Sequence, residues 1–167
     1  MDIIIYFYDE QKGMCTFKSR LLKLPNGYIV IKRPEKDTVK KIQRRRFFRV
    51  KVTDEMILYI PEEENPDKKK KVKVYTHDLS GGGISFLSKD NIVNIDDAVT
   101  GTLYLKKKHQ SMTKHFEATI VNVIKHNDRF YRISLQFENI NEKNQSDIIS
   151  YCFLKQVEIR NKTGEVN

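Results

Sequence analysis

Short apolar stretches alternate with turn residues along most of the chain. In the first part they span residues 3–8, 15–24 and 28–31, with turn residues at Lys12-Gly13 and Pro25-Asn26-Gly27. Runs rich in β-branched and aromatic residues between such turns are typical of strands. We therefore expect a small N-terminal sheet, in which aromatic residues such as Tyr6, Phe7 and Tyr8 contribute to the core.

A longer series of strand patterns follows a polar, charged segment at residues 34–41, which we interpret as a linker. The expected strands cover residues 48–52, 56–60, 72–77, 84–87, 102–105, 116–124 and 130–137. A charged loop, residues 61–71, is expected to be exposed. Regular short strands joined by turns predict an antiparallel barrel of about six strands.

The pattern changes to a helical period from Asn144 onward. Apolar residues then recur at spacings of three and four, which predicts an amphipathic helix. Asn144 or Ser146 is expected to cap its start, and Gly164 to lie past its end. A lone helix of this length is marginal in water, so its apolar stripe is expected to pack on the barrel. This stripe comprises Ile148, Ile149, Cys152, Phe153 and Val157.

The composition limits the fold to one or two small domains, since the chain has 167 residues. We expect residues 1–40 to form the N-terminal module with its linker, and residues 41–167 to form the barrel with its helix. Lys and Arg number 31 against 22 Asp and Glu, which gives a net charge of +9. This excess favours an anionic partner, whether a nucleotide, a nucleic acid or a membrane surface.

The remaining composition signals argue against several functional classes. Cys15 and Cys152 lie in patterned segments and are expected to be reduced and buried, and the scattered His residues lack zinc spacing. The N-terminal apolar run is too short for a signal peptide, and no stretch is long enough to span a membrane. The expected location is therefore the cytoplasm. No metal site is expected. No catalytic constellation stands out, because a Ser80–His77 pair would lack a third, orienting group.

Two short motifs carry the chemistry. The first is Arg45-Arg46-Phe47-Phe48-Arg49, and the second is Asp78-Leu79-Ser80-Gly81-Gly82-Gly83. An Arg-x-x-x-Arg match arises by chance about 0.5 times in such a chain, whereas Asp/Asn-x-Ser-x-x-Gly arises about 0.04 times. The pair in this order is therefore informative, although the first motif alone is not.

The residue types suit a guanine nucleotide. An Arg side chain offers two parallel donors to O6 and N7 of guanine, and it also binds phosphate and stacks on flat rings. Asp78 can accept from the N1–H and N2–H groups on the opposite edge. Ser80 can donate to a phosphate or cap the turn. Glycines remove Cβ atoms where a ring and a backbone approach closely, and we expect Gly83 to tolerate a side chain least and to need a positive φ.

These motifs resemble those of the PilZ domain family, small β-barrels that bind the bacterial second messenger cyclic di-GMP. The run from Gln43 to Val50 is similar to the start of such domains, and DLSGGGISF, residues 78–86, is similar to their second signature. Residues 3–36 resemble the later part of the N-terminal barrel of flagellar-brake (YcgR-like) members, whose first strands have no counterpart here. The resemblance thus implies a PilZ barrel preceded by a shortened N-terminal module.

The resemblance implies a receptor rather than an enzyme, with a ligand site formed by Arg44, Arg45, Arg49, Asp78, Ser80 and Gly83. In the family, a basic residue before the Arg-x-x-x-Arg run accompanies binding of a self-stacked pair of ligands, so Arg44 suggests two cyclic di-GMP molecules per chain. A flagellar motor protein or another effector is the implied partner. Two alternatives remain open: a sequence-tolerant nucleic-acid-binding barrel, and a PilZ-like adaptor that binds no ligand.

Overall fold

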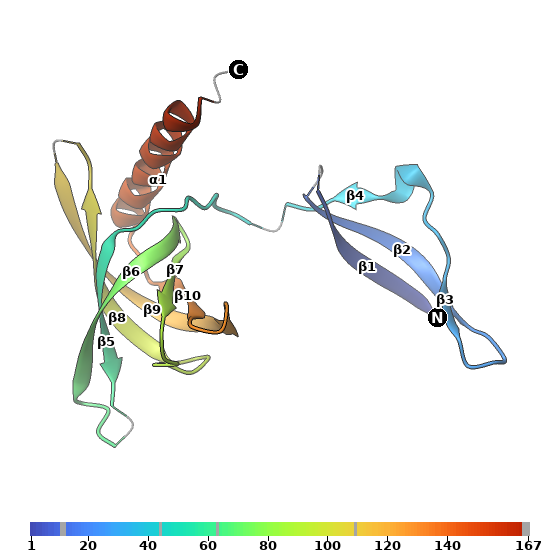
Figure 1. Cartoon of the computed structure of the whole chain (residues 1–167), viewed down its shortest axis with the longest axis horizontal. Coiled ribbons are helices and arrows are strands. Elements are labelled where there is room, and N and C mark those ends of the chain that lie inside the picture. Colours follow the sequence, from blue (N-terminus) through green and yellow to red (C-terminus); the bar gives the residue numbers. More distant parts are fainter. Residues whose placement is uncertain (11–12, 44, 63, 109, 165–167) are drawn as a thin grey trace. The chain divides into compact units, whose positions relative to one another are not determined.

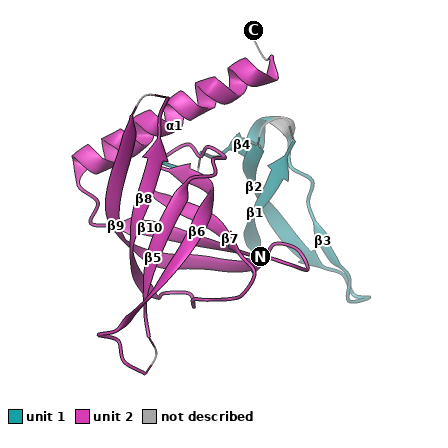
Figure 2. Ribbon diagram, turned by 60° about the vertical axis from the view of Figure 1, so that its left-hand side comes forward, with its two compact units in different colours: residues 1–46 teal, residues 47–167 magenta. Residues whose placement is uncertain are grey.

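The computed structural model describes residues 1–10, 13–43, 45–62, 64–108 and 110–164. The chain divides into two compact units, Met1–Arg46 and Phe47–Asn167, which Figure 2 distinguishes by colour.

The first unit is a small antiparallel sheet centred on its second strand. Strand β2 pairs with β1 and β3 and, near its start, with β4. The predicted three strands are confirmed, but the linker prediction was wrong in part. Lys40 and Lys41 form a strand because their backbone pairs with Thr16 and Cys15. The elements are β1 (Asp2–Asp9), β2 (Gly13–Lys23), β3 (Ile29–Ile31), a 3₁₀ turn (Lys36–Thr38) and β4 (Lys40–Lys41).

The two faces of strand β1 differ, because successive side chains of a strand point to opposite sides. The Phe7 ring contacts the Phe17 ring edge to face at 5.8 Å, and Cys15, opposite Phe7 on β2, is buried. Tyr6 and Tyr8 are 58% and 72% exposed. The prediction that these two tyrosines contribute to the core was therefore wrong, since they lie on the face opposite Phe7.

The second unit is a closed six-stranded antiparallel barrel with one helix, as predicted (Figure 1). The strand order around the barrel is β10-β7-β6-β5-β8-β9. Because the barrel is closed, each of its strands pairs on both sides, and no strand edge is left on which another chain could add a strand. The strands are β5 (Glu55–Pro61), β6 (Lys69–Ser80), β7 (Gly83–Ser88), β8 (Ala98–Lys106), β9 (Ser111–Lys125) and β10 (Tyr131–Glu138).

Two local expectations about this unit were wrong. Residues 48–52 do not form a strand, and their regular pairing is reduced to one bridge between Val50 and Leu79. The charged loop is also shorter than expected, because β6 begins at Lys69 and pairs there with Pro61. Lysines can occupy this strand end because their side chains remain exposed.

The barrel interior is the main hydrophobic core. Along β5 the buried residues alternate at Met56, Leu58 and Ile60, as expected of a strand with one face inside a barrel. Phe86 and Ile133, which face each other across β7 and β10, are fully buried in the same core.

Helix α1 (Glu142–Thr163) packs on the barrel, as predicted, and buries Ile148, Tyr151 and Cys152 in the same core. Its end at the left-handed Gly164 (φ 70°) is confirmed, but its cap is Asn141, whose side chain accepts from the Asn144 amide at 2.8 Å. The predicted stripe was partly wrong. Phe153 and Val157 are more than half exposed, because the buried face is centred on residues 148, 151 and 152.

Candidate nucleotide-binding site

The two sequence motifs meet through a backbone bridge. The Val50 amide donates to the Leu79 carbonyl at 2.9 Å, and the Leu79 amide donates to the Val50 carbonyl at 3.0 Å. Arg49 directly precedes one side of this bridge, while Asp78 and Ser80 flank the other. The structure therefore places Arg49, the last residue of the first motif, beside the Asp-x-Ser motif.

Two aromatic residues, Phe47 and Phe48, pack the segment before Arg49 against the rest of the second unit. A Cβ added at Gly81 or Gly82 would lie 3.0 Å from the Phe47 ring, so the ring lies directly against the glycine turn. The Phe48 ring contacts Phe153 of α1 edge to face, with centroids 4.8 Å apart. The backbone leading into Arg49 is thus fixed by packing on both the turn and the helix.

Gly83 is required because another strand approaches it closely. A Cβ at this position would lie 2.2 Å from the Leu135 carbonyl oxygen of β10, which is a severe backbone clash. The expectation of a positive φ was wrong: Gly83 is a regular residue of β7, and the described glycines with positive φ are Gly13, Gly27 and Gly164.

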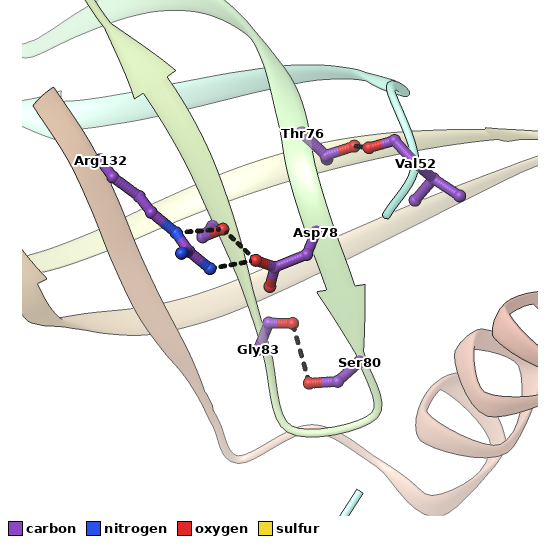
Figure 3. Close-up of polar contacts among 7 residues, drawn as sticks. Val52, Thr76, Asp78, Ser80, Gly83 and Arg132 are labelled. Atoms are coloured by element: carbon purple, nitrogen blue, oxygen red, sulfur yellow. Dashed lines mark hydrogen bonds and ion pairs between the residues drawn. The ribbon is translucent and has the colours of Figure 1, made fainter. Parts of the chain in front are cut away.

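Ser80 stabilises the glycine turn. Its hydroxyl donates to the Gly83 carbonyl at 3.2 Å (Figure 3). The same hydroxyl accepts from the Gly82 amide at 3.3 Å. Helix α1 contributes a further contact, since the Gln145 side-chain amide donates to the Gly81 carbonyl at 3.0 Å. Of the two roles that the sequence suggested for Ser80, the structure shows the turn cap.

Asp78 is held by two side chains that sequence reasoning did not identify. Its Oδ2 accepts from the Ser85 hydroxyl at 2.7 Å and forms an ion pair with the Arg132 guanidinium, which projects from β10 toward Asp78 (Figure 3). Arg132 also donates through Nε to the Ser85 hydroxyl at 3.3 Å. In the sequence, Arg132 is distinguished only as an Arg inside a strand pattern. No local pattern connects it with Asp78, which lies 54 positions earlier.

His77 adjoins this group. The pairing of β6 with β7 shifts between Thr76 and Asp78, which leaves His77 as an extra residue in a bulge. Its ring lies edge to face with His126, with centroids 5.6 Å apart. Burial and then the positive charge of Arg132 lower the pKa of His77, which favours its neutral form. The Ser80 hydroxyl is thus engaged by the turn, while the His77 ring contacts His126.

The remaining predicted site residues are Arg44 and Arg45. Arg44 lies outside the described residues. Arg45 belongs to the end of the first compact unit, and its carbonyl accepts from the Gln43 side-chain amide at 3.0 Å. The structure therefore brings together the backbone around Arg49, Asp78, Ser80 and Gly83, all in the second unit.

A second buried polar pair joins the barrel to α1. The Tyr151 hydroxyl lies 2.9 Å from both carboxylate oxygens of Asp54 and donates to them. Burial raises the pKa of Asp54, although the hydrogen bond from Tyr151 opposes the shift. Burial likewise raises the pKa of the neighbouring Cys152 to about 12, and both Cys15 and Cys152 are free and buried, as predicted.

Within the described ranges, no three His, Cys, Asp or Glu side chains gather as metal ligands would. Across the same residues, no helix combines the length and apolar character that crossing a membrane requires.

Comparison with known proteins shows the family to which the chain belongs. The model of the PilZ domain matches residues 43–154, and the chain belongs to this family. A relative from Bacillus subtilis (strain 168), the uncharacterized protein YpfA, is 21% identical over 168 residues, which covers 97% of this chain and 74% of YpfA.

Two solved structures share the fold. The B. subtilis inhibitor of motility (MotI/DgrA) superposes with a TM-score of 0.80 at 19% identity, covering 96% of this chain and 75% of that protein. Escherichia coli YcgR in complex with cyclic di-GMP superposes with a TM-score of 0.61 at 19% identity, covering 99% of this chain and 70% of YcgR.

Proposed function

We propose that this protein is a cyclic di-GMP receptor that couples the level of the messenger to a conformational change. The observation that carries the proposal is the bridge between Val50 and Leu79, which brings Arg49 beside the Asp78 motif. Membership of the PilZ family and the cyclic di-GMP complex of YcgR, a structural relative, support the same ligand.

Each proposed ligand residue has a role that follows from its chemistry. Arg45 and Arg49 contact the O6/N7 edge of guanine and the phosphates, because guanidinium groups offer paired donors to both. Asp78 accepts from the donor edge of guanine. Ser80 and Gly83 shape the floor of the site through the turn contacts described above, and Arg44 adds a contact that accommodates a second, stacked ligand. The protein acts by binding and not by catalysis, in the cytoplasm, where it meets an effector such as a motility protein.

Calorimetric titration with cyclic di-GMP tests the proposal. Arg45→Ala and Arg49→Ala are each expected to weaken binding at least about tenfold, which corresponds to the roughly 1 to 3 kcal/mol of a bidentate guanine contact. Arg129→Ala is the matched control, because Arg129 is exposed in the turn between β9 and β10 and its loss removes the same charge. Equal affinity of all four proteins, or no binding by the wild type, would overturn the assignment.

Titration also tests the number of ligands bound per chain and the nucleic-acid alternative. Two ligands per chain are expected from the Arg44 argument, and a single ligand would refute that stoichiometry. The nucleic-acid alternative predicts a steep loss of affinity for oligonucleotides as salt rises, because many phosphates must be neutralised, whereas a compact dinucleotide has few.

A further inference from the structure

Three strands contribute one side chain each to a closed polar triangle. Asp78 comes from β6, Ser85 from β7 and Arg132 from β10. The Ser85 hydroxyl donates to Asp78 at 2.7 Å and lies 3.3 Å from Arg132 Nε, while the terminal nitrogen of Arg132 pairs with the same Asp78 oxygen. Every side of the triangle is therefore an interaction, which fixes the orientation of the Asp78 carboxylate.

Both donors in this triangle use one oxygen of Asp78. A carboxylate has about four acceptor sites, two on each oxygen, so the two donors occupy those of Oδ2. The acceptor sites of Oδ1 match in number the N1–H and N2–H donors of guanine. The Asp78 side chain is only 10% exposed, so its orientation is set by these neighbours rather than by water.

This arrangement has a consequence for base selectivity. An ionised carboxylate can only accept hydrogen bonds. The corresponding edge of adenine presents an acceptor at N1, which would face the carboxylate oxygen without a proton between them. Hypoxanthine keeps the N1–H donor but lacks the N2 amino group. Polar sites of fixed geometry reject analogues that leave their groups unpaired more strongly than adaptable ones do.

We propose that Arg132 is a positioning residue that, together with Ser85, aims Asp78 at the donor edge of guanine and so sets selectivity for guanine over hypoxanthine and adenine. The inference rests on the proposed function, because it concerns the same site. Arg132 itself does not have to touch the ligand. Its side chain is 28% exposed, so its replacement does not empty the barrel core.

The test is a cycle of two proteins and two ligands, which isolates the coupling between Arg132 and the N2 amino group of guanine. Wild type and Arg132→Gln are each titrated with cyclic di-GMP and with its analogue in which hypoxanthine replaces guanine. Outside the cycle, both proteins are also titrated with cyclic di-AMP. The wild type is expected to bind the hypoxanthine analogue about tenfold more weakly than cyclic di-GMP. In Arg132→Gln this ratio is expected to fall to about threefold or less, with binding of cyclic di-AMP becoming relatively stronger.

Two more variants keep the test decisive. Arg132→Lys retains the charge and is expected to recover part of the selectivity, and it replaces Arg132→Gln as the test variant if circular dichroism shows the latter to be unfolded. Arg129→Gln, in the turn three residues earlier, is expected to leave both the affinity and the ratio unchanged.

The outcomes distinguish the two proposals. If wild type binds cyclic di-GMP and Arg45→Ala weakens binding as expected, but the folded Arg132 variant keeps the wild-type ratio, the positioning role is refuted while the receptor stands. If folded wild type binds no cyclic di-GMP at all, the receptor proposal fails, and the positioning role falls with it.

Discussion

At the scale of single residues, the sequence correctly predicted that Gly83 tolerates no side chain, but it gave only part of the physical reason. The sequence indicated that Gly83 lies where a backbone approaches, and the Leu135 carbonyl occupies that place. It did not indicate a regular strand conformation for Gly83. The turn residues instead face side chains, which can adjust: the Phe47 ring beside Gly82, and Ile149 together with Phe47 beside Gly81.

Replacing these glycines should therefore have unequal effects. Gly83→Ala is expected to lower the free energy of unfolding by about 3 kcal/mol, because a methyl group would be forced against a carbonyl oxygen that its own strand holds in place. Gly82→Ala, the matched control, is expected to cost about 1 kcal/mol, because the ring can move by a few tenths of an ångström. Urea denaturation measures both, and equal losses would contradict the close approach.

At the scale of elements, α1 is joined to the barrel by two carboxylates in opposite environments. Asp54 is buried under the Tyr151 hydroxyl, and burial raises its pKa. Asp147 on α1 lies 2.5 Å from the Lys114 ammonium of β9, and this hydrogen bond lowers its pKa. The two groups should make opposite contributions to the pH dependence of stability.

The sign of each contribution follows from proton linkage. A raised pKa in the folded state means that Asp54 contributes stability below its unfolded pKa of 3.8, which is lost as the pH rises through the folded value. Asp54→Asn removes this loss while keeping an acceptor for Tyr151. The stability of this variant relative to wild type is therefore expected to increase from about pH 4 to about pH 7.

Asp147→Asn supplies the opposite case. Its carboxylate contributes stability above the unfolded pKa of 3.8, and this contribution is lost as the pH falls through the lowered folded value. The stability of this variant relative to wild type is thus expected to decrease as the pH rises. Urea denaturation across the pH range checks both variants, and slopes of the same sign would refute the assignments.

At the scale of the whole molecule, the positive charge is distributed unevenly. Residues 1–46 contain 12 Lys and Arg against 5 Asp and Glu, out of 31 and 22 in the chain. The first and last arginines of the first motif also fall on either side of the division between the compact units, Arg45 before it and Arg49 after it. A ligand bound by both arginines would restrict the stretch of chain that connects the units.

Cyclic di-GMP is therefore expected to change the solution scattering of the full chain, because a ligand held by both Arg45 and Arg49 narrows the range of conformations of the chain between the units. The radius of gyration and the width of its distribution are the quantities to measure, with and without ligand. Asp78→Ala, titrated beforehand to confirm weakened binding, serves as the control and should show no change at the same ligand concentration. Identical scattering of free and bound wild type would exclude the coupling.

The sequence by itself determined the elements and the two motifs, because strand alternation, helix period, turn glycines and residue chemistry are properties of neighbouring residues. It therefore predicted the six barrel strands, the terminal helix and the candidate residues Arg49, Asp78, Ser80 and Gly83. It also placed a strand at residues 48–52, where the structure has a single bridge. It failed where a segment depends on a distant partner, as at Lys40–Lys41, which becomes a strand only by pairing with β2.

Only the tertiary structure decided which groups surround Asp78 and Gly83. The closed barrel sets the register of β6, β7 and β10, and that register brings Arg132 and Ser85 to Asp78 and the Leu135 carbonyl to Gly83. No local pattern encodes such pairings, because they depend on how strands far apart in sequence align when the barrel closes.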